Sequence, residues 1–253
     1  MKKISKSLAF LLSLVMLLSV VSVPAMADDV PATTIQPLDD VNIGRGSTPP
    51  INLAGVNKIR LFNIDGNTSW GSTAIGAFAY DVSEVFATLA QNPDYVVDSV
   101  KFVPTATKDE GDTTSMTLEF CPISVKWSSS DKEGYTTITT ANRGTIIPFS
   151  GTGTEFTAET LSLECKTNPI SGQFDITPLF KKHMTNNQGT DLQNFFSFAL
   201  KMKDTNGGNE AQDIASLESG DGAEIVVTYV KPEALSLTEY KLPTQPKDEV
   251  VLT

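Results

Sequence analysis

Histidine and cysteine are scarce in this chain, which has one histidine, His183, and two cysteines, Cys121 and Cys165. Closed zinc sites take four nitrogen or sulfur ligands, and catalytic zinc sites usually take three ligands from the protein. The composition therefore argues against a zinc site. No serine or cysteine stands in a motif with a histidine and an acid, so the sequence also gives no sign of a hydrolytic triad.

Positive charge is also in short supply. The chain has 19 Lys and Arg against 30 Asp and Glu, which gives a formal net charge of −11. A negative field of this size repels phosphate backbones and anionic lipid surfaces. We therefore expect no nucleic-acid partner.

The N-terminus has the pattern of a secretory signal peptide. Three lysines lie within the first six residues, residues 8–23 are apolar apart from serines, and residues 24–27 read Pro-Ala-Met-Ala. The apolar run is short for a spanning helix, which needs about 20 residues, and it ends in a small-residue cleavage pattern. The sequence predicts cleavage after Ala27, a secreted or extracellular protein, and no membrane segment after cleavage. Export makes a disulfide between Cys121 and Cys165 chemically possible, and the spacing leaves open whether it forms.

The remaining chain divides by composition into three parts. Residues 28–56 are rich in Asp, Pro, Thr and Gly, which indicates an extended leader or linker. Residues 57–231 hold many short apolar-alternating runs separated by turn residues, and residues 232–253 form a polar tail with three prolines. Short helices are predicted at 84–90 and just after Phe174–Ile176, where Thr177 precedes a proline at the first turn. This order predicts an all-β fold, a jelly-roll-like antiparallel β-sandwich with two short helices.

Several runs predict which side chains form the core. Residues 160–166 alternate, with Leu161, Leu163 and Cys165 on one face. The same alternation places two further sets of side chains in the core. They are Phe196, Phe198, Leu200 and Met202, and Ile225, Val227 and Tyr229. In residues 115–127 the apolar parity switches at Cys121, and a bulge at Cys121–Pro122 would return both halves to one face.

A series of short motifs occurs in chain order at 67–72 (Asn-Thr-Ser-Trp-Gly-Ser), 80–83 (Tyr-Asp-Val-Ser), 97–102, 125–127 (Val-Lys-Trp), 174–177 (Phe-Asp-Ile-Thr), 198–201, 214–219 and 225–229. In this order the motifs resemble those of the secreted bacterial and archaeal β-sandwich family named DNRLRE after its own motif. They cover most of residues 57–231. The name-giving motif itself is absent, and so is the Trp that the family places after the second helix. The strand order is also similar to that of growth-factor propeptide domains.

The resemblance implies an exported or wall-associated β-sandwich, and some members of that family are counted as carbohydrate-binding modules. We therefore expect a secreted, non-catalytic module of a bacterial surface or extracellular protein, which binds glycan or serves as a structural or adhesive domain. Its partners would be polysaccharide or cell-surface and wall components. The alternative is a glycan-active enzyme, a hydrolase or a lyase, because catalytic carboxylate pairs cannot be located from sequence.

Three aromatic residues are candidates for a ligand-binding face. Trp70 lies in a Gly/Asn/Ser-rich loop, and Trp127 and Tyr135 flank the polar loop 128–134. Sugar rings pack their C–H faces on aromatic faces, so exposed aromatics at one end of a sandwich would suit a glycan. The competing interpretation is that these rings belong to the core at the ends of strands.

One loop carries oxygen-bearing side chains that calcium accepts, namely Asp204, Asn206, Asn209 and Asp213. Their spacing is not that of an EF-hand, which needs a glycine at its sixth position and a glutamate at its twelfth. A solvated hairpin loop explains the same composition. No cofactor other than this weak calcium candidate is expected.

Overall fold

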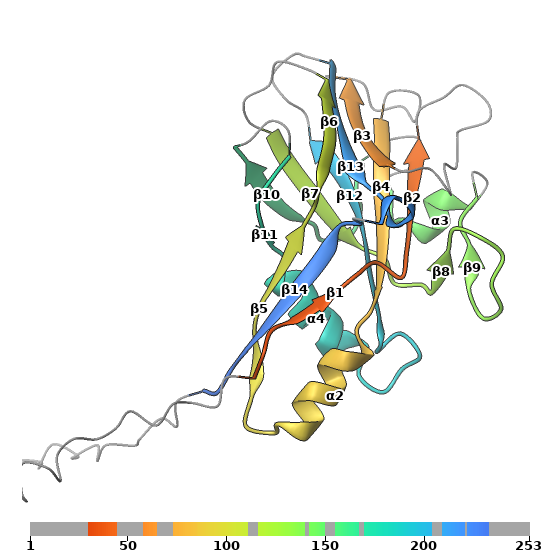
Figure 1. Cartoon of the computed structure of the whole chain (residues 1–253). Helices are drawn as coiled ribbons and strands as arrows, with labels where there is room; N and C mark the ends of the chain where they lie inside the picture. The colour runs from red at the N-terminus through yellow and green to blue at the C-terminus, as the bar shows by residue number, and fades with distance from the viewer. Residues whose placement is uncertain are drawn as a thin grey trace, which may run out of the picture.

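Two antiparallel sheets face one another and form a β-sandwich, as the sequence predicts (Figure 1). The computed structural model describes residues 30–44, 58–64, 73–110, 116–139, 142–149, 155–166, 170–203, 209–220 and 222–232. The predicted signal peptide and the predicted C-terminal tail beyond residue 232 lie outside these ranges.

The smaller sheet has four strands in the order β1-β14-β5-β11. Its central strands are β14 (Glu224–Val230) and β5 (Val96–Val103), and its edge strands are β1 (Thr33–Ile35) and β11 (Phe174–Asp175). The strand β11 pairs only with the C-terminal half of β5, through Phe174↔Phe102 and Asp175↔Lys101. Among the described strands, the first half of β5 therefore has a neighbour on one side only.

The larger sheet has eight strands, and its main path follows the order β10-β7-β12-β4-β3-β13-β6, with β2 paired to β4. Their bounds are β2 (Asp39–Gly44), β3 (Lys58–Ile64), β4 (Thr73–Asp81), β6 (Ala106–Glu110), β7 (Met116–Pro122), β10 (Leu161–Cys165), β12 (Phe195–Lys203) and β13 (Asn209–Ala215). All of these pairings are antiparallel.

Two helices lie together at one end of the sandwich, α2 (Ser83–Gln91) and α4 (Thr177–Asn186) (Figure 1). The outer face of the larger sheet carries the one-turn helix α3 (Arg143–Ile146) and the short parallel pair β8 (Trp127–Ser128) and β9 (Thr136–Thr137). A 3-10 turn, η2 (Leu217–Ser219), precedes β14.

The main core lies between the two sheets and is rich in aromatic rings. Phe198 is fully buried at its centre, with ring centroids at 5.5 Å from those of both Phe102 and Phe120. The predicted core residues of β12 and β14 belong to this cluster, with Tyr229 packed at its margin. The predicted sharing of one core by these strands is therefore confirmed.

A second core covers the outer face of the larger sheet. It contains Cys121 of β7 and Ala199 of β12, closed over by Trp127 and Ile147 from the outer layer. The parity switch at Cys121 is therefore not a bulge that returns both halves to one face. The residues before it face the inner core, while Cys121 and Ile123 face the outer one, because this sheet is covered on both sides.

The predicted leader, residues 28–56, is partly built into the fold, which corrects the boundary placed at residue 57. Thr33–Ile35 pairs with β14 as strand β1, and Asp39–Gly44 pairs with β4 as strand β2. Ile35 is buried in the inner core, and Val41 and Ile43 are buried in the outer one. The composition suggested a linker because the strands are short and one carries polar residues whose partners are distant in sequence.

Two consecutive aspartates attach β2 to the rest of the molecule. Asp39 accepts hydrogen bonds from the Ser128 hydroxyl (2.8 Å) and the Ser129 amide (2.9 Å) in the outer layer. Asp40 is buried and accepts a hydrogen bond from the Leu217 amide at 2.7 Å through Oδ2. Its other oxygen, Oδ1, has no hydrogen-bond partner among the described residues. A buried carboxylate with a single hydrogen bond is costly to ionise.

The disulfide left open by the sequence is excluded by strand register. Cys165 lies opposite Met116 on β7, and Cys121 lies five residues further along that strand. Five residues of extended chain span roughly 16 Å, whereas bridged Cα atoms lie within about 7 Å of each other. The two cysteines also face different cores, and they are not bridged to one another.

Candidate functional site

The three predicted aromatic ligand residues do not form one face in the described structure. Trp70 lies outside the described residues. Trp127 is fully buried in the outer core, edge-on to Phe195 with ring centroids 6.5 Å apart. A ring with no exposed surface cannot stack on a sugar, so the assignment of Trp127 to a binding face is corrected to a core role.

Tyr135 is partly buried, and cations and a core ring occupy its surroundings. The Lys126 and Lys132 ammonium groups lie 4.7 and 4.2 Å from the ring centroid, and Phe195 packs edge-on at 5.7 Å. Cations over an aromatic face are attracted by the ring quadrupole. A sugar would have to displace a lysine to stack on this ring.

The four predicted calcium ligands do not form a calcium site among the described residues. Asp204 and Asn206 lie outside the described residues, and Asn209 begins strand β13. Asp213 is buried and forms ion pairs with Lys58 at 2.6 Å and with Arg60 at 3.8 Å, so its charge is already compensated. Across the described ranges no cluster of three or more His, Cys, Asp or Glu side chains could hold a metal ion.

The two end helices begin in the same way. Asp81 accepts a hydrogen bond from the Ser83 amide, and Asp175 accepts one from the Thr177 amide, both at 3.0 Å. An aspartate two residues before the first helical amide offers an oxygen to a donor that has no partner inside the helix. Each motif thus ends a strand and starts a helix at the same end of the sandwich.

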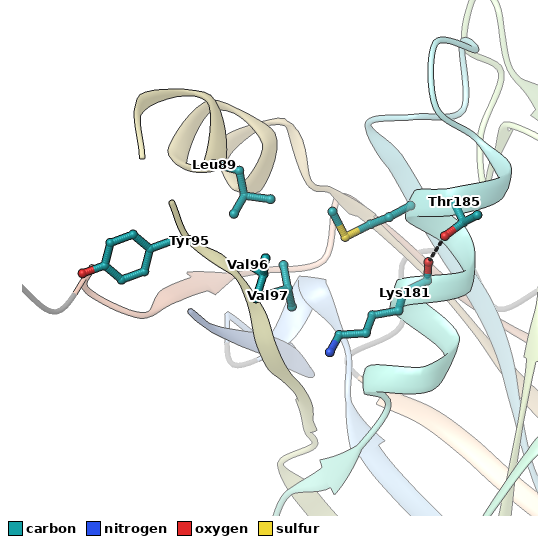
Figure 2. A pocket seen from close by; sticks show the side chains of 7 residues that line it. Leu89, Tyr95, Val96, Val97, Lys181 and Thr185 are labelled. Atoms are coloured by element: carbon teal, nitrogen blue, oxygen red, sulfur yellow. Dashed lines mark hydrogen bonds between the residues drawn. The ribbon is translucent and has the colours of Figure 1, made fainter. Parts of the chain in front are cut away.

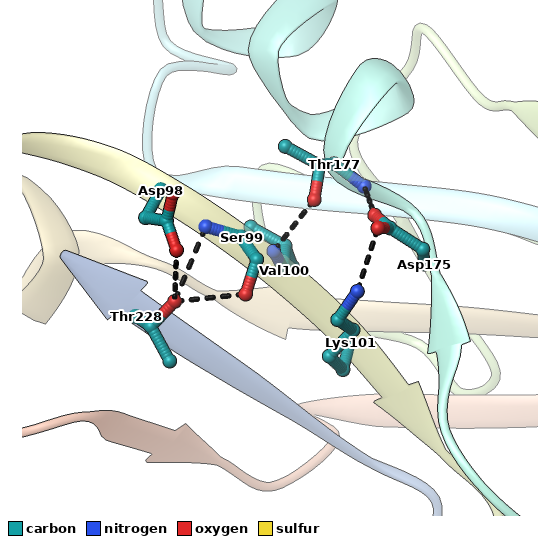
Figure 3. A network of polar contacts seen from close by, with 7 residues as sticks. All are labelled: Asp98, Ser99, Val100, Lys101, Asp175, Thr177 and Thr228. Atoms are coloured by element: carbon teal, nitrogen blue, oxygen red, sulfur yellow. Dashed lines mark hydrogen bonds and ion pairs between the residues drawn. The ribbon is translucent and has the colours of Figure 1, made fainter. Parts of the chain in front are cut away.

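A polar network attaches the start of α4 to β5 (Figure 3). The Lys101 ammonium contacts Asp175 at 2.6 Å, and the Val100 amide donates to the Thr177 hydroxyl at 2.8 Å. The Ile176 amide donates back to the Val100 carbonyl at 2.9 Å. Burial alone would raise the pKa of Asp175, but the hydrogen bonds from Lys101 and Thr177 outweigh it and lower that pKa to about 2. The helix α4 is therefore fixed at its first turn. Two surface hollows lie beside it, one on each side.

The first hollow is a pocket of about 220 Å³ between α4, the end of β7 and the segment before β10. Its apolar floor is provided by Phe196 and Leu179, both buried. Ser124, Asn186 and the ion pair between Lys182 and Glu159 contribute polar groups to its walls.

His183 also borders this pocket, but its ring is held by the protein. Nε2 lies 3.1 Å from the Gln193 carbonyl, and Nδ1 lies 3.1 Å from the Asn187 side-chain amide nitrogen. A carbonyl can only accept and an amide N–H can only donate, so the ring carries its proton on Nε2. Burial lowers the pKa of His183 below its ordinary value. The histidine is thus neutral near the end of α4.

The second hollow is an apolar groove of about 360 Å³ on the other side of α4 (Figure 2). It lies between α4, the end of α2 and the start of β5. Leu89, Val96, Val97 and Met184 supply most of its lining, with Tyr95, Lys181 and Thr185 around them. Val96 is 46% exposed and, with Leu217 and Val230, is one of the large hydrophobic side chains exposed among the described residues.

Neither hollow was predicted as a binding site from the sequence. Lys181 and Lys182 are adjacent, yet they belong to different hollows because successive positions on a helix point in different directions. Glu159 and Ser124 come from loops remote in sequence, so no local spacing could have indicated them. The one available signal was Thr177-Pro178, which predicts where α4 begins and so where both hollows lie.

No family model and no curated protein matches this chain. The resemblance to the DNRLRE family therefore remains a prediction from its motifs. Within the described part of the chain, no helix has the length and apolar character that crossing a membrane requires.

Proposed function

We propose that this protein is a secreted, non-catalytic binding module that takes a neutral glycan in the 220 Å³ pocket beside α4. The observation that carries the proposal is the pairing of an apolar floor with a ring of hydrogen-bonding side chains in a space of this size. Small-ligand sites commonly combine an apolar lining with a few polar groups that fix orientation.

The polar groups of this pocket are complementary to sugar hydroxyls. Lys182 and Glu159 place a donor and an acceptor side by side, and the amide of Asn186 offers both. The hydrogen bond and the charge of Lys182 lower the pKa of Glu159, which favours the charged form of this carboxylate. A neutral ligand also suits a chain with a net charge of −11, which would repel an acidic polysaccharide.

A binding role is favoured over catalysis by the state of His183. Its two ring nitrogens are engaged by Gln193 and Asn187, so neither is free to take a proton from a substrate. The carboxylate of Glu159 is paired with Lys182. The competing function is a glycan hydrolase or lyase, which would release reducing ends or unsaturated products from polysaccharides.

A glycan array tests the proposal with two adjacent lysine variants. Lys182→Gln changes the pocket wall, while Lys181→Gln changes a neighbouring lysine that faces the groove on the other side of α4. We expect the wild type to bind at least one neutral glycan, Lys182→Gln to bind it about fivefold or more weakly, and Lys181→Gln to bind it normally. The fivefold figure corresponds to about 1 kcal/mol for one charge-assisted contact at a partly exposed site.

Four outcomes would count against the proposal. Equal binding by both lysine variants would remove the pocket from the site. Loss of binding in Trp70→Ala would instead place the site on the loop that carries Trp70. Absence of binding to every glycan would favour a purely structural or adhesive domain, and product release from a polysaccharide would favour the enzyme.

A further inference from the structure

Among the described strands, the first half of β5 has one unpaired edge, and it carries an exposed apolar side chain, that of Val96. On the side of α4, β11 pairs only with Lys101 and Phe102. The backbone amide and carbonyl of Val100 are hydrogen-bonded by Thr177 and Ile176 at the start of α4. No described strand pairs with residues 96–99 on that side. An open edge with exposed apolar residues is a site of strand addition unless it is covered.

The shape of β5 directs this edge toward the groove. The register with β14 shifts at Thr228, where the Ser99 amide and hydroxyl bond the Thr228 hydroxyl at 3.2 and 2.8 Å (Figure 3). Bulges of this kind bend the strand and re-aim its side chains. Beyond the shift, Val96 and Val97 line the groove between β5 and α4 (Figure 2).

Within the described part of the chain, the Lys181 ammonium beside the groove has no carboxylate as a counter-ion. No carboxylate of the described residues lies within ion-pair distance of the Lys181 ammonium, whereas the adjacent Lys182 is paired with Glu159. In Figure 2 the Lys181 side chain runs from α4 toward β5. In a chain with a net charge of −11, an uncompensated lysine beside an apolar groove is complementary to a carboxylate on an apolar ligand.

We propose that this groove binds an extended peptide segment of another protein, which adds as a strand to residues 96–99 of β5. An apolar side chain of the peptide fills the space between Val97, Leu89 and Met184, and a carboxylate that follows it pairs with Lys181. Strand addition explains the open edge, the groove explains the exposed Val96, and the lysine sets the register of the peptide. Main-chain hydrogen bonds give affinity in this mode, and the side-chain pocket gives selectivity. The site is separate from the glycan pocket and does not depend on it.

The test uses a defined probe, an acetylated six-residue peptide of alternating threonine and valine that ends in leucine with a free carboxylate. Its matched control is the same peptide with a carboxamide end. Titration into the ¹⁵N-labelled protein should shift the amides of residues 96–99 and of Met184, and leave those of β2 unchanged. We expect the carboxamide to bind about fivefold more weakly, as expected for loss of one partly exposed ion pair.

The two adjacent lysines again provide the decisive comparison. Lys181→Gln should reduce affinity for the carboxylate peptide to that for the carboxamide, and Lys182→Gln should leave it unchanged. Val96→Thr, a change at an exposed position that should not disturb folding, should weaken both peptides. The proposal is overturned if the peptide causes no saturable shifts, if the shifts lie away from β5 and α4, or if the two lysine variants behave alike.

Discussion

The buried carboxyl group of Asp40 should make the stability of this protein fall as the pH rises through neutrality. Burial raises the pKa of Asp40 from 3.8 to about 7, the Leu217 amide lowers it, and the charges of Glu218 and Asp39 raise it further. The protonated form is therefore the stable one in the folded state. Because the folded pKa lies above the unfolded value, the contribution of this group to stability is complete below pH 3.8 and is lost as the pH rises through about 7.

The size of this effect follows from the difference between the two pKa values. At about 1.4 kcal/mol per pKa unit, ionisation of Asp40 lowers the free energy of unfolding by about 4 kcal/mol in total. About 2.5 kcal/mol of this loss occurs between pH 5 and pH 8. Asp40→Asn removes the ionisation and can still accept the Leu217 hydrogen bond. We therefore expect the variant to lose the pH dependence and to be the more stable protein at pH 8.

Urea denaturation of wild type and Asp40→Asn, measured at half-unit steps from pH 5 to pH 8, isolates the contribution of Asp40 ionisation to the free energy of unfolding. The difference between the two unfolding free energies cancels other groups, including His183, whose lowered folded pKa makes stability fall toward acid instead. The expected difference changes by about 2.5 kcal/mol in favour of the variant across this range. Parallel curves for the two proteins would refute the reasoning.

The remaining predictions concern packing and the cysteines. Phe198→Ala should destabilise the fold by about 3–5 kcal/mol in chemical denaturation, because the ring is fully buried in an aromatic cluster, and a loss below about 1 kcal/mol would contradict that burial. Gly76→Ala places its Cβ 2.6 Å from Ile59 Cγ2 and should cost about 1–3 kcal/mol, whereas Gly144→Ala on α3 meets no atom within 4 Å and should be tolerated. The unfolded protein should titrate two thiols per chain without reductant, and the folded protein should react slowly because burial raises the pKa of Cys121 to about 12. A result of no titratable thiol would require the bridge that strand register excludes.

The sequence predicted the sandwich and the helix starts because those signals are local. Alternation in β10 and the Thr177-Pro178 pair at the start of α4 depend only on neighbouring residues. The outer core was missed, although a signal was present. Phe195–Met202 is buried at every position, as expected for a strand covered on both faces, and its apolar residues at both odd and even positions, such as Phe195 and Phe196, could have indicated this.

Strand β2 and the two hollows were missed for a different reason. Asp40 and Asn42 look like linker residues because their partners, the Leu217 amide and the Arg60 carbonyl, are brought to them only by the fold. The glycan pocket depends in the same way on Glu159 and Ser124 meeting Lys182. Local pattern cannot reveal contacts between segments so far apart in sequence.

The proposed glycan site is tested most directly by mapping the bound sugar on the protein. The ¹⁵N-labelled protein is titrated with the neutral oligosaccharide that binds most strongly on the array. Binding in this pocket should cause saturable shifts at the amides of Ser124 and Asn187 and at the side-chain amide of Asn186, with none at residues 96–99. Saturable shifts confined to other surfaces, or the absence of shifts around α4, would contradict it.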